Sequence, residues 1–259
     1  MVSPVPLIIT QHGSSRDGIR FPNSTGKTDE FSSRIIKTGI DRGFAVVAID
    51  AFYKTDLKPN NKGQFPNAYQ YALDLKHIFS TDPRFDSKNI FYTGFSYGAR
   101  QVNKSVGVMV ERPNSVPWRS VASIEPGCNV INEPIKVSFP ILLIKGSESH
   151  YYPEPCYYFT EMVRKSGNTI KMEVINGANH FFSSNGRIIN GLAFNGCRYN
   201  PVIKISSGSF VFSDGSITSR EEIRQKCFTK EGGSGKDRVF LDGVVNTVVD
   251  FFQENIISK

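Results

Sequence analysis

The chain has 259 residues, of which 39% are hydrophobic and 21% are charged, a balance typical of globular proteins and not of disordered ones. That length suits a single α/β domain over residues 1–259, and no apolar run approaches the 18 or so residues of a membrane span. The net charge is +7, yet the 31 basic residues are spread along the chain without a dense block. We therefore interpret the charge as a solvated surface and expect no nucleic-acid partner.

Apolar runs that alternate with helical patterns predict a doubly wound, mainly parallel sheet with helices on both faces. The predicted strands are residues 6–10, 44–50, 89–94, 119–125, 140–145 and 170–176. Helical spacing of apolar residues is clear in 71–79 and in 99–110, and a closing helix is predicted over 238–252 with Asp237 as its N-cap. Ligands bind such sheets at the carboxyl ends of the strands, so we expect functional residues in the loops that follow strands.

The five residues Gly94-Phe95-Ser96-Tyr97-Gly98 place a serine between a predicted strand and a predicted helix. In a G-x-S-x-G turn the glycines lack a Cβ, so the backbone can turn sharply and leave the serine hydroxyl projecting above the sheet. Small residues at such a junction can also serve packing alone. The order of strand, turn and helix favours Ser96 as a nucleophile.

A hydroxyl needs a base to remove its proton, and the chain has four histidines. His77 lies in an amphipathic helical stretch, where a solvated position is expected. His12 and His150 each follow an earlier strand. His180 follows the strand 170–176 and precedes the closing helix, which is the place of the base in the chain order serine, acid, histidine. We therefore expect His180 to be the base.

Four stretches occur in a characteristic order and spacing, and together they span residues 6–182. They are the strand 6–10 with His12-Gly13, residues 43–53 (GFAVVAIDAFY), residues 94–98 and residues 177–181 (GANHF). In these stretches the chain resembles the dienelactone hydrolase family of α/β-hydrolases. The resemblance implies the α/β-hydrolase fold. It also implies further strands before residue 6, so the chain either begins late or has lost a leading segment.

The resemblance further implies that the backbone N–H groups of Ser14 and Tyr97 form an oxyanion hole, which stabilises the charge that develops on a substrate carbonyl. Tyr97 would open a helix, whose free N–H groups and dipole favour negative charge. Gly13 would let its loop fold close to the substrate, and His12 would have a structural role in that loop.

The chain departs from the family at the nucleophile and at the acid. Founding members carry a cysteine nucleophile where this chain has Ser96, so the resemblance implies a more general esterase. Members commonly carry an aspartate at the position that Ser149 occupies here.

Two glutamates are candidates to replace that aspartate as the partner of the histidine. Glu148 is one residue earlier on the same loop, and Glu125 ends the strand 119–125, where some hydrolases of this fold carry their acid. We favour Glu148, while Glu125, a weak dyad without an acid and an inactive protein remain alternatives.

Residues 183–237 form an excursion between the histidine loop and the closing helix, rich in Gly, Ser and Asn. Short β-prone runs at 201–205, 209–212 and 216–218, separated by turn residues, predict a small β-meander. Because the excursion begins next to His180, it either walls the substrate site or is a surface embellishment.

The four cysteines lie neither in C-x-x-C spacing nor beside a histidine pair, so we expect disulfides and no metal site. Cys128 and Cys156 follow neighbouring strands and are predicted to pair. Cys197 and Cys227 would then staple the excursion, which stabilises the fold by about 3 kcal/mol in the chain-entropy model. Disulfides indicate a periplasmic or secreted protein. The start, MVSPVP, lacks signal-peptide features, so a presequence was removed or never existed.

The sequence thus predicts a hydrolase that cleaves a small or polymeric carboxylic ester through an acyl-enzyme without a cofactor. Ser96 would be the nucleophile, His180 the general base and then acid, and Glu148 the orienting carboxylate. Aromatic residues at loop positions are candidates for an apolar substrate pocket. They are Phe52, Tyr53, Tyr97, Tyr151, Tyr152, Phe181 and Phe182. The alternatives are an amide or peptide hydrolase on the same fold and a non-catalytic binding protein that has lost the usual acid; the oligomeric state is left open.

Overall fold

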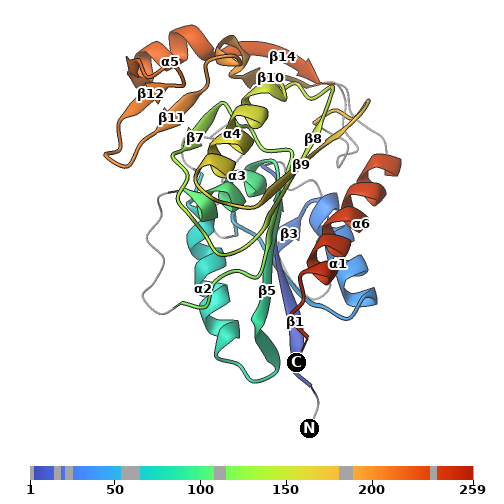
Figure 1. Ribbon diagram of the computed structural model, residues 1–259. Coiled ribbons are helices and arrows are strands. Elements are labelled where there is room, and N and C mark those ends of the chain that lie inside the picture. Colours follow the sequence, from blue (N-terminus) through green and yellow to red (C-terminus); the bar gives the residue numbers. More distant parts are fainter. Residues whose placement is uncertain are drawn as a thin grey trace.

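The protein is built around a six-stranded sheet, seen in the computed structural model in Figure 1. The structure describes residues 3–14, 19–20, 26–53, 65–107, 115–180, 189–233 and 238–258. The strand order is β4-β1-β5-β6-β8-β9, and every neighbouring pair is parallel. The strands are β1 (Val5–Gln11), β4 (Ala45–Ile49), β5 (Phe85–Phe95), β6 (Val121–Ile124), β8 (Ile141–Gly146) and β9 (Ile170–Ile175). All six predicted strands are present, and each central strand is an apolar run because both faces of the sheet are covered.

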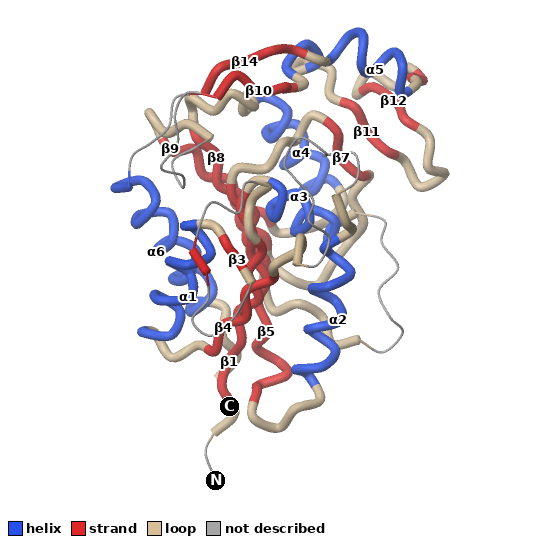
Figure 2. The backbone as a smooth tube through the Cα atoms, turned by 180° about the vertical axis from the view of Figure 1, so that it is seen from behind, coloured by secondary structure: helices blue, strands red, loops and turns tan. Residues whose placement is uncertain are grey.

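Helices cover both faces of this sheet, as Figures 1 and 2 show from opposite sides. On one face, α1 (Glu30–Asp41) and α6 (Arg238–Glu254) pack through a core that includes Phe31, Leu241 and Phe252. On the other face lie α2 (Ala68–Ser80), α3 (Tyr97–Asn103) and α4 (Glu154–Lys165), packed through a second core that includes Trp118. The predicted doubly wound α/β architecture is confirmed.

Two predicted helix boundaries differ from the structure or lie outside it. The helix expected over 99–110 begins earlier, at Tyr97, and its α-helical part ends at Asn103, followed by a 3₁₀ turn at Lys104–Val106. Residues 108–110 and the proposed N-cap Asp237 lie outside the described residues. No helix in the described ranges has both the length and the apolar character that crossing a membrane would need.

The excursion contains the predicted meander and extends it. Strands β11 (Val202–Lys204), β12 (Phe210–Phe212) and β13 (Ile217–Thr218) pair antiparallel, and β7 (Val130–Asn132) joins β11 in parallel from outside the excursion. Strand β10 (Ile189–Ala193) pairs with β14 (Thr229–Gly233), and α5 (Arg220–Cys227) lies between β13 and β14 in the chain. A two-residue pair, β2 (Ile19–Arg20) with β3 (Lys27–Thr28), precedes α1. In Figure 1 the excursion lies above the carboxyl ends of the central strands.

Two disulfides tie these parts together. Cys128 bonds to Cys156 and Cys197 bonds to Cys227, which are the two expected pairs. The first joins the segment after β6 to α4, and the second closes the excursion on itself. The partners are 28 and 30 residues apart, so each bond restricts the unfolded chain by an amount worth roughly 3.5 kcal/mol.

Candidate active site

Ser96 stands on a sharp turn between β5 and α3. Its backbone has φ 52° and ψ −106°, a left-handed conformation that L-residues rarely adopt. A Cβ at position 94 would lie 2.6 Å from the carbonyl carbon of Gly98, and a Cβ at position 98 would overlap the carbonyl oxygen of Gln11. Both glycines are therefore required for the turn, as their pattern in the sequence indicated, and the strain is concentrated at the serine.

His180 lies directly against this serine. The distance from Ser96 Oγ to His180 Nε2 is 2.9 Å, and the histidine is only 5% exposed. The serine comes from the end of β5 and the histidine from the loop after β9, 84 residues further along the chain. The two residues selected from the sequence are therefore within hydrogen-bonding distance.

The carboxylate against the histidine is Glu125, not the favoured Glu148. Glu125 Oε2 lies 2.9 Å from His180 Nδ1, in a buried position directly after β6. Glu148 is exposed, and its backbone N–H donates to the carbonyl of Ala178 at 2.9 Å. The loop after β8 turns the side chain of Ser149 inward and that of Glu148 outward, so a carboxylate at position 148 does not substitute for one at 149.

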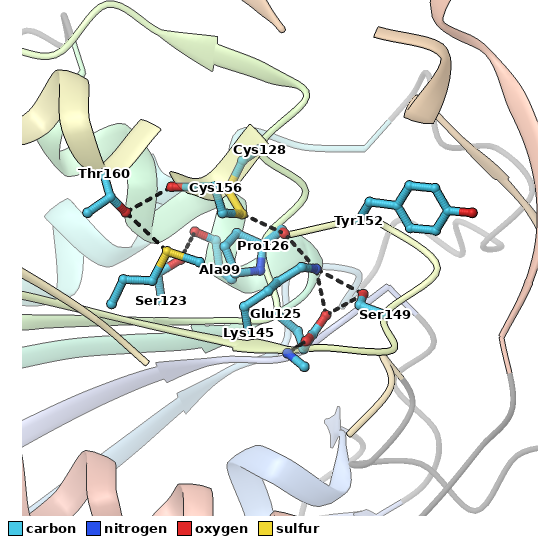
Figure 3. The surroundings of a disulfide bond; sticks show 12 residues. Ala99, Ser123, Glu125, Pro126, Cys128, Lys145, Ser149, Tyr152, Cys156 and Thr160 are labelled. Carbon is cyan, nitrogen blue, oxygen red and sulfur yellow. Dashed lines mark hydrogen bonds and ion pairs between the residues drawn. A yellow bond between two sulfur atoms is a disulfide. The ribbon is translucent and has the colours of Figure 1, made fainter. Parts of the chain in front are cut away.

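Glu125 is held by a set of buried donors. The N–H of Gly146 donates to Oε1, while the Lys145 ammonium and the Ser149 hydroxyl each donate to Oε2 at 2.8 Å. Lys145 also donates to Ser149 Oγ at 2.9 Å and to the carbonyl oxygen of Pro126 at 3.2 Å. Figure 3 shows Lys145 and Ser149 converging on Glu125 beside the Cys128–Cys156 disulfide. Lys145 was not selected from the sequence, although a lysine directly after the apolar run Ile141–Ile144, still within the strand, is a signal that a buried acid lies nearby.

The charge state of Glu125 follows from these contacts. Burial alone would raise its pKa, but the Lys145 ammonium, together with the hydrogen bond from His180, lowers the pKa of Glu125 to about 2. Burial lowers the pKa of Lys145, and the charge of Glu125 offsets part of that effect. The carboxylate is therefore ionised at neutral pH, when it can accept a hydrogen bond from His180 Nδ1–H.

The loop after β1 passes close to the serine. A Cβ at position 13 would lie 3.5 Å from Ser96 Cβ. The N–H of Gly13 donates at 2.5 Å to the carboxylate of Asp29, which is the N-cap of α1. His12 Nε2 accepts the N–H of Ala51 at 2.9 Å, so its protonated Nδ1 donates to the carbonyl of Gly13 at 2.6 Å. Buried His12 therefore shapes the loop.

A cavity of about 710 Å³ opens onto the serine and the histidine. Ser14 and Tyr97, the two expected oxyanion-hole residues, line it beside Ser96 and His180. The excursion supplies a wall through Phe194, Lys204, Phe210 and Phe228. Of the two interpretations of the excursion, the one in which it borders the site therefore agrees with the structure.

Only some of the aromatic residues that were expected to line the substrate pocket line the cavity. Tyr97 and Tyr151 line the cavity, together with Phe65 and Phe159, which were not selected from the sequence. Phe52 is buried and stacks on Tyr97 with ring centroids 5.4 Å apart, so it supports the wall from behind. Tyr53 is 48% exposed, Tyr152 is not among the lining residues, and Phe181 and Phe182 lie outside the described residues.

Comparison with solved structures identifies the architecture. Esterase 2 of Thermogutta terrifontis, phosphoramylated by tabun, matches with a TM-score of 0.54 at 16% identity, over 71% of this chain and 76% of that chain. The same esterase with propionate bound has a TM-score of 0.53 at 15% identity, with the same coverage. A candidate dienelactone hydrolase from Klebsiella pneumoniae subsp. pneumoniae has a TM-score of 0.51 at 16% identity, over 70% of this chain and 77% of that chain. This is an α/β-hydrolase fold.

At this level of identity the likeness extends to the α/β-hydrolase fold and no further. No protein-family model and no curated protein sequence matches the chain. Within the described ranges, no group of three or more His, Cys, Asp or Glu side chains is arranged to hold a metal ion.

Proposed function

We propose that this protein is a serine-dependent hydrolase that cleaves a carboxylic ester through an acyl-enzyme. The observation that carries the proposal is a row of three side chains at hydrogen-bonding distances from one another, beside a cavity. Ser96 Oγ lies 2.9 Å from His180 Nε2, and His180 Nδ1 lies 2.9 Å from Glu125 Oε2. Nucleophile, base and orienting acid follow one another at hydrogen-bonding distances, which is the arrangement that activates a serine hydroxyl.

Each group in this chain has a distinct chemical task. His180 Nε2 takes the proton of Ser96 as the hydroxyl attacks the ester carbonyl. Glu125 accepts a hydrogen bond from Nδ1–H, holds the tautomer that leaves Nε2 free, and stabilises the imidazolium that forms. The protonated His180 then gives its proton to the departing alcohol. In the second half of the reaction His180 removes a proton from the water that hydrolyses the acyl-enzyme.

The oxyanion that forms on the substrate needs donors that are already in place. We assign this task to the backbone N–H groups of Ser14 and Tyr97. Tyr97 is the first residue of α3, so its N–H has no partner within the helix, and Ser14 borders the same cavity as Ser96. The bonds from Gly13 to Asp29 and from His12 to Gly13 support the loop that carries Ser14.

Ester cleavage is favoured over amide cleavage by the structural neighbours. The Thermogutta terrifontis protein is described as an esterase, with propionate bound in one structure. The serine at position 149 favoured a non-catalytic binding protein, but Glu125 supplies a carboxylate 2.9 Å from His180 Nδ1, which supports catalysis instead. Both disulfides also support maturation in an oxidising compartment, such as a periplasm or the exterior of the cell.

Fluorophosphonate labelling and turnover of short p-nitrophenyl esters test the proposal. We expect the label on Ser96 in the wild type and none in Ser96→Ala. Glu125→Gln should lower kcat by about 10²- to 10⁴-fold, whereas its matched control Glu148→Gln should stay within about twofold of the wild type. A wild-type protein that takes no label and turns over no ester would be a binding protein instead. Full activity in Glu125→Gln would remove Glu125 from the mechanism.

A further inference from the structure

Three cations line the cavity that contains Ser96 and His180. Arg100 belongs to α3 and Lys104 to the 3₁₀ turn after it, so they follow Ser96 by one and two helical turns. Along the helix axis these steps correspond to about 6 Å and about 12 Å. Lys204 comes from β11 of the excursion and lines the same cavity. The positive charge therefore extends from the reactive serine along α3.

No carboxylate pairs with these cations within the part of the chain that the structure describes. None of the described residues lining the cavity is acidic, and none of the three cations is in an ion pair there. Glu133 follows the lining residue Asn132, but its carboxylate accepts the backbone N–H of Ser206 at 3.0 Å.

Lys104 is surrounded by neutral acceptors and by the other two cations. Its ammonium donates to two neutral acceptors, Asn67 Oδ1 at 2.7 Å and Gln101 Oε1 at 2.8 Å. Burial, together with the charges of Arg100 and Lys204, lowers the pKa of Lys104 to about 8. An anion in the cavity would stabilise the charged lysine and relieve this repulsion.

Amide side chains complete the polar part of the lining. Asn67, Gln101, Asn103, Asn129 and Asn132 all border the cavity. Asn129 Nδ2 already donates to the carbonyl of Phe194 at 3.0 Å, and the N–H groups of the other four are suitable additional donors to an anionic group. The lining thus combines fixed positive charge with neutral donors, which is a combination that recognises carboxylate and phosphate oxygens.

We infer that the ester hydrolysed at this site carries an anionic group, a carboxylate or a phosphate, on the part of the substrate that lies along α3. Arg100 and Lys104 would bind it from the helix and Lys204 from the excursion. The group would lie roughly 6 to 12 Å along α3 from the scissile carbonyl. The inference rests on the proposed ester hydrolysis and names the class of ester. Arg100 offers a planar fork for two oxygens, and the lysines add point charges.

The test compares kcat/KM within matched pairs of esters. The p-nitrophenyl monoester of suberic acid is compared with p-nitrophenyl octanoate, and 6-butyryloxyhexanoate with hexyl butyrate, to place the charge on the acyl or the alcohol side. An ω-phosphate analogue of the preferred anionic ester then distinguishes phosphate from carboxylate. We expect the anionic ester of at least one pair to be preferred about tenfold or more, mainly through KM, with a preference that declines as salt increases.

Replacing each cation in turn tests whether the preference for anionic esters depends on it. Lys104→Met should reduce the ratio of anionic to neutral kcat/KM about tenfold, and Arg100→Met and Lys204→Met should each reduce it. Lys88→Met is the matched control, because it removes the same charge from an exposed position in the first half of β5. The control should leave the ratio unchanged.

The failure of this inference is distinguishable from the failure of the proposed function. Equal kcat/KM within every pair, or the same ratio change in Lys104→Met and Lys88→Met, overturns the inference while ester hydrolysis stands. If no ester is turned over, calorimetry of suberate and phosphate with Ser96→Ala still decides. Binding that Lys104→Met abolishes in that background supports the anionic subsite, and absence of binding refutes it.

Discussion

Replacing Lys145 by methionine removes the buried cation beside Glu125 while keeping a side chain of similar length. In the wild type, Lys145 is completely buried and donates to Glu125, Ser149 and the carbonyl of Pro126 at 2.8 to 3.2 Å. The variant leaves Glu125 buried with His180, the Ser149 hydroxyl and the N–H of Gly146 as its partners. Two measurable consequences follow, one on stability and one on the ionisation of the histidine.

The stability cost can be worked from the carboxylate. A pKa of Glu125 that falls from its ordinary 4.5 to about 2 corresponds to roughly 3 kcal/mol of stability at neutral pH, and Lys145 is the main cause of that fall. Breaking a buried ion pair by removing one partner costs about 3 to 5 kcal/mol, which agrees. We therefore expect the melting temperature at pH 7 to fall by about 6 to 12 °C.

The second consequence concerns pH dependence. Without Lys145, Glu125 loses the ammonium that opposes its charge at 2.8 Å, so the carboxylate interacts more strongly with protonated His180. The acid limb of the kcat/KM profile for p-nitrophenyl butyrate should then move to higher pH in Lys145→Met.

Lys171→Met is the matched control for both measurements. Lys171 lies on β9 and pairs with Glu173 at 2.6 Å, but its side chain is 69% exposed, so its loss should leave the melting temperature and the pH profile close to those of the wild type. Melting temperatures and pH profiles that are the same in the two variants would refute the argument, because Lys145 would then not stabilise the Glu125 carboxylate.

Three further predictions concern acid stability, the serine turn and the excursion. Because the folded-state pKa of Glu125 is depressed, the stability that this carboxylate contributes is fully present above about pH 4.5 and is lost as pH falls towards 2. Urea unfolding of the wild type should therefore show a loss of up to roughly 3 kcal/mol in the free energy of unfolding over that window, and Glu125→Gln should show a smaller loss. Gly98→Ala should destabilise the fold by about 3 kcal/mol, measured by thermal unfolding, since its Cβ would overlap the backbone of Gln11; an unchanged melting temperature would contradict this close approach of the two backbones. Replacing Cys197 and Cys227 by serine should cost about 2 to 5 kcal/mol and raise KM for esters, because the excursion walls the cavity; unchanged KM would separate the excursion from substrate binding.

Local sequence determined the sheet, the serine turn and the choice of histidine. Each depends on residues that are close in sequence. Apolar runs form strands, a G-x-S-x-G turn follows from two missing Cβ atoms, and the histidine is selected by its place after the last strand of the sheet. The Cys128–Cys156 pair also followed from position, because neighbouring parallel strands bring their carboxyl ends together, and Cys197 and Cys227 were then left to pair.

The tertiary structure alone decided the acid and the character of the cavity. Glu125 and Glu148 both follow strands that end near His180, and the selection depends on which way the loop after β8 turns and on the buried Lys145, 20 residues from Glu125 in sequence. The position of Lys204 beside the same cavity as Arg100 and Lys104 likewise depends on how the excursion folds over the sheet. A carboxylate's role is set by burial and by charges brought from distant segments, and these are properties of packing that no local pattern encodes.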